Sequence, residues 1–205
     1  MKKVLSIVAT LAALAGTASA APYVLPSPQP GALTPYDMQP HYALDAIYSI
    51  ADDSEFVNMY GVRGSFNLYT SGTDLVRHQF NINVAGMLGN ETKHIDGCSV
   101  KVDAYTLPIT GGYDLNVAVS DEVLLFLGGK AGYSFVDIKE KCYGETYKTN
   151  KGGFTFSVGG GIKVQCSDAV MLKLGYEFGR TYVDANDDKF NFGQHSIIAG
   201  VSVQF

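Results

Sequence analysis

Apolar and polar residues alternate with a period of two along most of this chain, and this alternation constrains the fold more than any other feature. It is clearest over residues 104–119, where mostly large apolar side chains hold the odd positions and small or polar ones the even positions. Successive side chains of a β-strand point to opposite faces, so this segment predicts a strand with one apolar face. Its 16 residues far exceed the roughly 5–6 of a typical globular strand.

The same alternation recurs in seven further segments, which are 41–50, 56–68, 76–88, 123–136, 154–166, 170–181 and 195–205. Three connections between them are tight (70–75, 120–122 and 167–168), three are longer and richer in charge (89–99, 137–153 and 183–189), and 51–55 is short. Along an up-and-down meander, the three tight connections fall at the end that holds both termini. The pattern therefore predicts an all-β, antiparallel, eight-stranded fold with its long loops at the opposite end.

The first 20 residues have the pattern of a secretory signal peptide. Lys2 and Lys3 precede a short apolar stretch, and a small-residue site ends at Ala20, where we expect cleavage. The stretch is too short to cross a bilayer comfortably as a helix. Residues 21–40 contain six prolines, which favour extended, unpaired backbone. We therefore expect a signal peptide (1–20), a proline-rich N-terminal segment (21–40) and one barrel domain (41–205).

Charge and hydropathy exclude several classes of protein. Without Lys2 and Lys3 the chain has 13 basic residues against 20 acidic ones, a formal net charge of 13 − 20 = −7, which argues against nucleic acid as a partner. No apolar run after the signal segment approaches the roughly 18 residues of a membrane helix. With a mean hydropathy of +0.06, hydropathy alone describes a soluble secreted protein.

Two barrel architectures fit strands of this kind. In a secreted ligand-binding barrel the apolar face points inward, whereas in an outer-membrane barrel it points to lipid and the polar face fills the lumen. The long strands match a tilted bilayer crossing of about 9–11 residues. Aromatic residues on the apolar parity, such as Phe56, Tyr105 and Phe154, lie near strand ends as in interfacial girdles. The polar parity carries charges of both signs, namely Arg63, Arg77, Asp114, Lys130, Lys163, Lys173 and Glu177. These features favour a transmembrane β-barrel, with the soluble barrel as the alternative.

Over about residues 42–205 the chain resembles the small eight-stranded outer-membrane barrels of Gram-negative bacteria, the OmpA/OmpX-like family. The cleavage site, the eight strands, the asymmetry of the connections and the ending IIAGVSVQF carry the resemblance. It implies an outer-membrane location with periplasmic termini and extracellular loops. It also implies a monomer that meets membrane lipid, lipopolysaccharide and, during biogenesis, the barrel-assembly machinery. That machinery would read Ile197, Ala199, Val201, Val203 and Phe205. Pro108 departs from an ideal closed-barrel strand, because proline cannot donate a backbone hydrogen bond, and it predicts a bulge.

The three cysteines have different surroundings. Cys98 and Cys142 lie in two long connections that flank neighbouring strands at one rim, so in an oxidising compartment they are candidates for a disulfide, with free thiols as the alternative. Cys166 lies beside a tight turn at the other end, where we expect an unpaired residue.

The charges on the polar parity allow two interpretations. One is structural pairing, such as Lys163 or Lys173 with Asp114 or Glu177, and the other is a gated ion path. We favour pairing, because the interior of an eight-stranded barrel is just wide enough for side chains.

The sequence predicts no catalytic residue, metal site or cofactor. His195 and Ser196 are adjacent and so point to opposite faces of a strand. The acidic segment 184–188 lacks the glycine and the final glutamate of a calcium loop. We therefore expect a non-enzymatic structural or surface-interaction protein that acts through the loops 89–99 and 137–153. A narrow channel and a soluble ligand-binding barrel are the alternatives.

Overall fold

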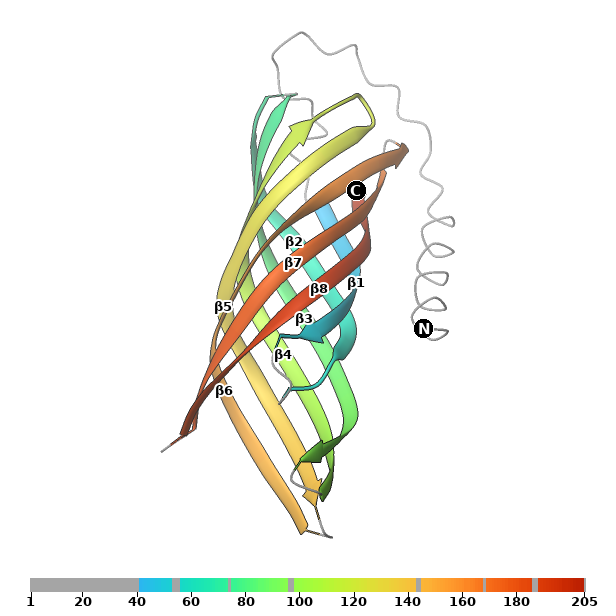
Figure 1. Ribbon diagram of the computed structural model, residues 1–205. Coiled ribbons are helices and arrows are strands. Elements are labelled where there is room, and N and C mark those ends of the chain that lie inside the picture. The colour runs from blue at the N-terminus through green and yellow to red at the C-terminus, as the bar shows by residue number, and fades with distance from the viewer. Residues whose placement is uncertain are drawn as a thin grey trace.

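Eight antiparallel strands close into one barrel (Figure 1). They are β1 (His41–Ala51), β2 (Met59–Gly72), β3 (Val76–Ile95), β4 (Cys98–Ala118), β5 (Val123–Cys142), β6 (Glu145–Ser167), β7 (Val170–Ala185) and β8 (Asp188–Gln204). The computed structural model describes residues 41–52, 56–73, 75–95, 98–142, 145–167, 169–185 and 188–204. Within these residues no helix is long and apolar enough to cross a membrane. The prediction of an up-and-down eight-stranded barrel is confirmed.

The last strand closes the barrel by pairing with the first, from His41↔Gln204 to Ala51↔Gln194. Four of the residues predicted to form the assembly signal lie on β8, opposite Tyr42, Leu44, Ala46 and Tyr48 of β1. Both ends of the barrel domain therefore lie together, at the end that also holds the tight turns (Figure 1). Phe205, the predicted signal peptide and the proline-rich segment lie outside the described residues.

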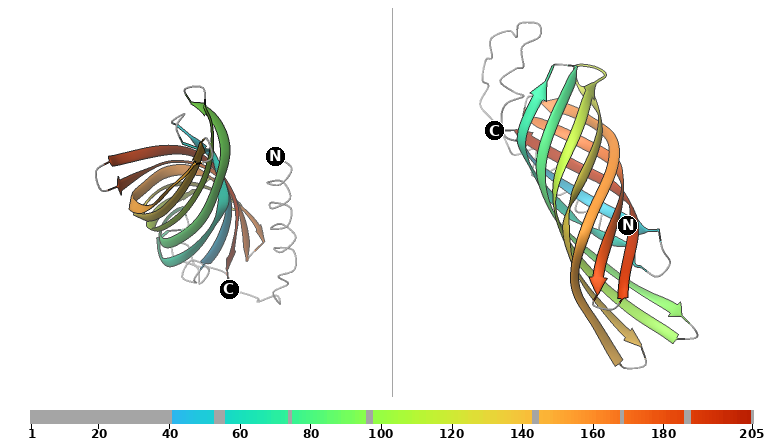
Figure 2. Two further views of the ribbon diagram at one scale, coloured as in Figure 1. Left: turned by 90° about the horizontal axis from the view of Figure 1, so that it is seen from below. Right: turned by 90° about the vertical axis from the view of Figure 1, so that its left-hand side faces the viewer.

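The predicted long loops 89–99 and 137–153 are mostly strand, which corrects their interpretation as loops. β3 and β4 remain paired out to Ile95↔Cys98, and β5 and β6 out to Cys142↔Glu145. β7 and β8 likewise pair as far as Ala185↔Asp188, within the predicted loop 183–189. The two central hairpins project beyond the rest of the barrel (Figures 1 and 2). Sequence alternation missed these parts because it detects a difference between two faces, whereas the backbone ladder needs no such difference.

A band of exposed apolar side chains surrounds the barrel. On β5, for example, Leu125, Leu127, Tyr133 and Phe135 point outward, and Leu127 is 66% exposed. Beyond Leu88, Tyr105, Phe135 and Phe154 the outward positions of β3–β6 change to polar residues, which include Asn90, Thr92, Lys101, Asp103, Lys139, Lys148 and Asn150. The band thus has a sharp edge, as expected where strands leave a bilayer. A soluble barrel would have turned this apolar face inward.

Pro108 causes no bulge, contrary to the sequence prediction. The β4–β5 ladder passes through Pro108↔Ser134 without a shift. The β3–β4 ladder goes from Val84↔Ile109 to Met87↔Thr106 in one register, so it skips the proline and resumes. A missing N–H removes one ladder bond toward β3 without adding a residue. Register shifts occur instead in β2 between Asn67 and Tyr69, and in β6 between Gln165 and Ser167.

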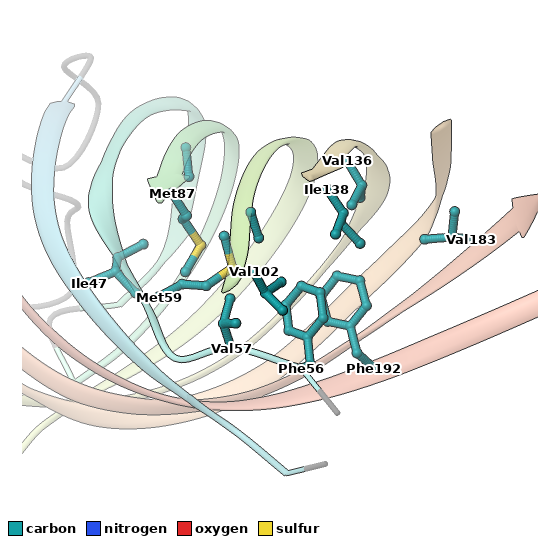
Figure 3. Close-up of a cluster of buried hydrophobic side chains, with 12 residues drawn as sticks. Ile47, Phe56, Val57, Met59, Met87, Val102, Val136, Ile138, Val183 and Phe192 are labelled. Atoms are coloured by element: carbon teal, nitrogen blue, oxygen red, sulfur yellow. The ribbon is translucent and has the colours of Figure 1, made fainter. Parts of the chain in front are cut away.

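An apolar cluster fills the lumen near the end where the hairpins project (Figure 3). Its members are Ile47, Phe56, Val57, Met59, Ala85, Met87, Val102, Ala104, Val136, Ile138, Val183 and Phe192. Phe56 was expected in the lipid-facing girdle, yet it is buried here, because Phe56 and Val57, just before β2, pack into this cluster. Its ring stacks on Phe192, with centroids 3.8 Å apart and an interplanar angle of 12°.

Candidate functional site

Four buried charged residues form an ionic cluster across the middle of the lumen. Arg63 on β2 donates from Nε and Nη2 to Oδ2 of Asp45 on β1, at 2.9 and 2.6 Å. Its Nη1 donates to Oε2 of Glu177 on β7 at 2.7 Å. Lys130 on β5 pairs with the other oxygen of Glu177. Because charge-assisted bonds are strong in a low-dielectric interior, the cluster ties together strands on opposite sides of the barrel.

Two further lysines lie on the side of the cluster toward the termini. Lys173 Nζ lies 3.3 Å from Oδ2 of Asp45. Lys163 Nζ lies 4.0 Å from Oδ2 of Asp114, and donates to Asn116 Oδ1 at 2.6 Å and Gln79 Oε1 at 3.1 Å. Both ammonium groups also lie over the ring of Phe126, which is buried in the lumen. Their distances to the ring centroid are 5.2 Å for Lys163 and 5.0 Å for Lys173, within the range of a cation–π contact.

All seven charged residues assigned to the lumen from the sequence have inward positions, but the pairings differ from those expected. Lys163 lies near Asp114, as proposed, whereas Lys173 meets Asp45, and Glu177 meets Arg63 and Lys130. Arg77 lines a cavity near the termini. Sequence reasoning missed Asp45, although it is fully buried and central to the cluster. Its parity with Ala43 and Ile47 was the available signal, but the weak alternation of this strand hid it.

Each lumen carboxylate lies directly across from a glycine on a neighbouring strand. The pairs are Asp45↔Gly200, Asp114↔Gly128 and Glu177↔Gly159. A Cβ at Gly128 or Gly200 would overlap Oδ1 of the facing aspartate, and one at Gly159 would come within 2.5 Å of Cγ of Glu177. The glycines therefore provide the space in which the carboxylates lie against the barrel wall.

We expect Gly128→Ala to lower the free energy of unfolding by about 1–3 kcal/mol, because the added methyl group displaces the Asp114 carboxylate. Gly111→Ala is the matched control, since Gly111 lies on the neighbouring strand with open space around its Cβ position. Urea unfolding of both variants, followed by gel mobility without boiling, measures the difference. Equal midpoints would show that the glycine facing Asp114 is not required for packing.

Two small cavities lie on either side of the ionic cluster. The one toward the termini has a volume of about 70 Å³ and is lined by Asp45, Lys130 and residues nearer the turns. The other, of about 80 Å³, is lined by Arg63, Glu177 and Lys130. Because Lys130 lines both, the cluster separates them. The apolar cluster then fills the lumen beyond the second cavity, so two different barriers lie along the barrel axis.

The described residues on either side of 53–55, between β1 and β2, contact neighbouring strands. Asp52 accepts hydrogen bonds from Gly193 N at 2.9 Å and Arg180 Nη2 at 3.4 Å. Lys93 Nζ donates to the carbonyl oxygen of Phe56 at 2.5 Å. The contacts hold Phe56 and Val57 in the apolar cluster.

The cysteines occupy both ends of the barrel. Cys142 is disulfide-bonded, and Cys166 is free and exposed. The side chain of Cys98 lies outside the described residues, so its pairing with Cys142 stays a prediction. The backbone register is compatible with it, because Lys101↔Lys141 brings the outer ends of β4 and β5 together.

His195 and Ser196 lie on opposite faces of β8. Ser196 Oγ shares a 2.7 Å hydrogen bond with Ser49 Oγ on the inner face, whereas His195 is exposed and bonds through Nδ1 to the hydroxyl of Tyr176. Among the residues described, no group of three His, Cys, Asp or Glu side chains is arranged to hold a metal. Of the predicted acidic segment 184–188, no side chain is described.

A comparison with protein families gives a result that is consistent with the polar lumen and the lipid-facing band. The family model of the outer membrane protein beta-barrel domain matches residues 6–205. The chain belongs to this family. A search of curated proteins finds no match.

Several solved barrels of this kind share the fold. Neisserial surface protein A has 17% identity and a TM-score of 0.56, with 81% of this chain and 97% of that chain covered. The outer membrane enzyme PagL has 12% identity and a TM-score of 0.53, with 80% and 99% covered. Ail, the attachment invasion locus protein of Yersinia pestis, has 12% identity and a TM-score of 0.51, with 82% and 99% covered. Such low identities establish the fold alone, and PagL shows that this barrel fold is compatible with enzyme activity.

Proposed function

We propose that this outer-membrane barrel is a non-enzymatic surface-interaction protein that acts through the part of β3–β6 outside the apolar band. One observation carries the proposal: the four strands continue beyond the band as an extension, defined here as residues 90–95, 98–103, 137–142 and 145–151. Its outward face is polar, and its strands remain hydrogen-bonded well beyond the band edge at Leu88 and Phe135. A barrel that only anchored or stiffened the envelope would need no such projection.

The extension offers two strand edges for contact. In the described residues, pairing of β2 with β3 ends at Met59↔Gly89, and pairing of β6 with β7 ends at Gly153↔Val183. Beyond these pairs, the described parts of β3 and β6 are each paired with one neighbouring strand only. Exposed edges can accept a further strand from a partner. Tyr147, which is 60% exposed, adds an aromatic contact on the β6 edge.

The contents of the lumen weigh against the channel alternative. An ionic cluster and an apolar cluster both occupy the barrel axis, and the two cavities between and beside them have room for only a few water molecules. The family and the names of Neisserial surface protein A and Ail support a role at the cell surface. We therefore propose that the extension faces the exterior and the termini face the periplasm. Lipopolysaccharide, the assembly machinery and a monomeric state stay predictions.

Trimming the extension tests the proposal. An Asn-Gly turn would replace residues 94–99 between Lys93 and Val100, and another would replace 140–147 between Lys139 and Lys148, because both pairs are in register. The change also removes Cys98 and Cys142 together. Cells that display the complete barrel are expected to be retained on surfaces coated with matrix protein, mucin or sulfated glycan, and cells with the trimmed barrel are not.

Heat-modifiable gel mobility serves as the control that the trimmed barrel folds. An impermeable maleimide that labels Lys148→Cys in intact cells, but not a cysteine placed at Ser120 in a tight turn, tests the orientation. Equal retention of complete and trimmed barrels would contradict the proposal. Absence of retention above cells without the barrel, on every coating, would contradict it too.

A further inference from the structure

The cavity toward the termini is rich in positive charge. Arg77, Lys130, Lys163 and Lys173 line it, together with the side-chain amides of Gln79 and Asn116. Its volume of about 70 Å³ compares with the roughly 10–15 Å³ that a single water needs on the same measure. It therefore has room for several waters or for one tetrahedral anion.

The carboxylates around this cavity do not match the cations. Oδ2 of Asp45 accepts hydrogen bonds from both Arg63 and Lys173. The close contacts of Lys163 Nζ, at 2.6 and 3.1 Å, are to neutral amide oxygens, while its nearest carboxylate oxygen is 4.0 Å away. Even without Arg77, the ionic cluster and this cavity together hold four cations, Arg63, Lys130, Lys163 and Lys173, against three carboxylates, Asp45, Asp114 and Glu177. An excess of buried positive charge is costly, and a bound anion would reduce that cost.

One oxygen of Asp45 and one of Asp114 take no part in the contacts with the lysines. Oδ1 of Asp45 and Oδ1 of Asp114 are buried, and neither has a hydrogen-bond partner in the described structure. Each of these atoms faces a glycine of the next strand, Gly200 and Gly128. The remaining ammonium donors of Lys163 and Lys173 are thus left to the cavity.

We propose that this cavity binds a small oxyanion such as inorganic phosphate, held mainly by Lys163 and Lys173. The anion would accept ammonium N–H bonds that the carboxylates leave free, and would offset the charge excess.

The anion reaches the site from the termini end of the barrel. Leu124 and Met171, which line the cavity, are each the second residue of their strands, so the cavity lies at the mouth of the lumen. Its other side is bounded by the ionic cluster, and the apolar cluster lies beyond. The cavity is therefore a pocket that is closed on its inner side. An anion can bind in it, but the geometry does not support passage of the anion through the barrel. This site is independent of the surface role proposed above.

Calorimetric titration of inorganic phosphate into the full barrel, refolded in zwitterionic detergent, tests the inference. The buffer keeps ionic strength constant with chloride. The unchanged protein is expected to bind one phosphate saturably. Lys163→Met, which keeps the aliphatic stem beside Phe126, is expected to weaken binding about tenfold or more, because a charge-assisted contact is lost. Lys173→Met is the second variant, expected to act in the same direction.

Lys148→Met on the extension is the matched control and is expected to bind phosphate like the unchanged protein. No saturable heat with the unchanged protein would overturn the proposal whether or not any variant folds. Equal affinity in the unchanged protein and either lumen variant would overturn it as well. Loss of binding in Lys148→Met would instead place the phosphate on the outer surface.

Discussion

Arg63→Met is expected to lower the free energy of unfolding by about 3–5 kcal/mol, the range seen when one partner of a buried ion pair is removed. The guanidinium makes three hydrogen bonds to Asp45 and Glu177, and its side chain is only 5% exposed. Without it, Asp45 retains Lys173 and Glu177 retains Lys130, but the strands β1, β2 and β7 lose the group that joins them. Arg63→Lys is expected to have a smaller effect, because it keeps a positive charge beside the carboxylates. Some stability is still lost, because one ammonium cannot replace a planar fork that bridges two carboxylates.

Urea unfolding in detergent, monitored by gel mobility of unboiled samples, measures this loss. Lys148→Met is the control, because it also removes a positive charge, but from an exposed side chain on β6. A midpoint for Arg63→Met equal to that of Lys148→Met would mean that the ionic cluster contributes nothing to stability.

Leu127→Arg is expected to destabilise the barrel in lipid by about 2–4 kcal/mol, the cost of an arginine near the bilayer midplane. Leu127 is 66% exposed and lies inside the apolar band, between Leu125 and Tyr133 on β5. Its side chain packs against little protein, so the cost comes from the contact of charge with hydrocarbon.

Thr146→Arg provides the comparison, because Thr146 is exposed on the part of β6 beyond the band. Folding into phospholipid vesicles at increasing urea is measured for both variants. The free energies of unfolding of the two variants are expected to differ by most of the roughly 2–4 kcal/mol that an arginine costs near the bilayer midplane. If both unfold at the same urea concentration, the band does not face lipid and the proposed membrane boundary is wrong.

The barrel was predictable from the sequence because lipid and lumen impose opposite demands on alternate residues. Eight stretches of alternation, with both termini on the side of the tight turns, define the strand number and order. The extension was not predictable in the same way. Beyond Leu88 and Phe135 water covers the outer face, so the contrast between the faces fades while the backbone ladder continues. Polar strands therefore looked like loops.

The inward parity of Arg63, Lys130 and Glu177 follows from the sequence by itself, because a period of two assigns each strand residue to a face. Which charges meet was decided by the tertiary structure, since pairing across the lumen depends on stagger between distant strands. Asp45 lies on a strand of weak alternation, so the sequence did not reveal its role. It contacts Lys173 on β7 because pairing of β1 with β8 closes the barrel. Phe56 was expected in the girdle but belongs to the apolar cluster, for a related reason. Its place depends on the path of a connection, and a connection has no alternation that fixes the direction of its side chains.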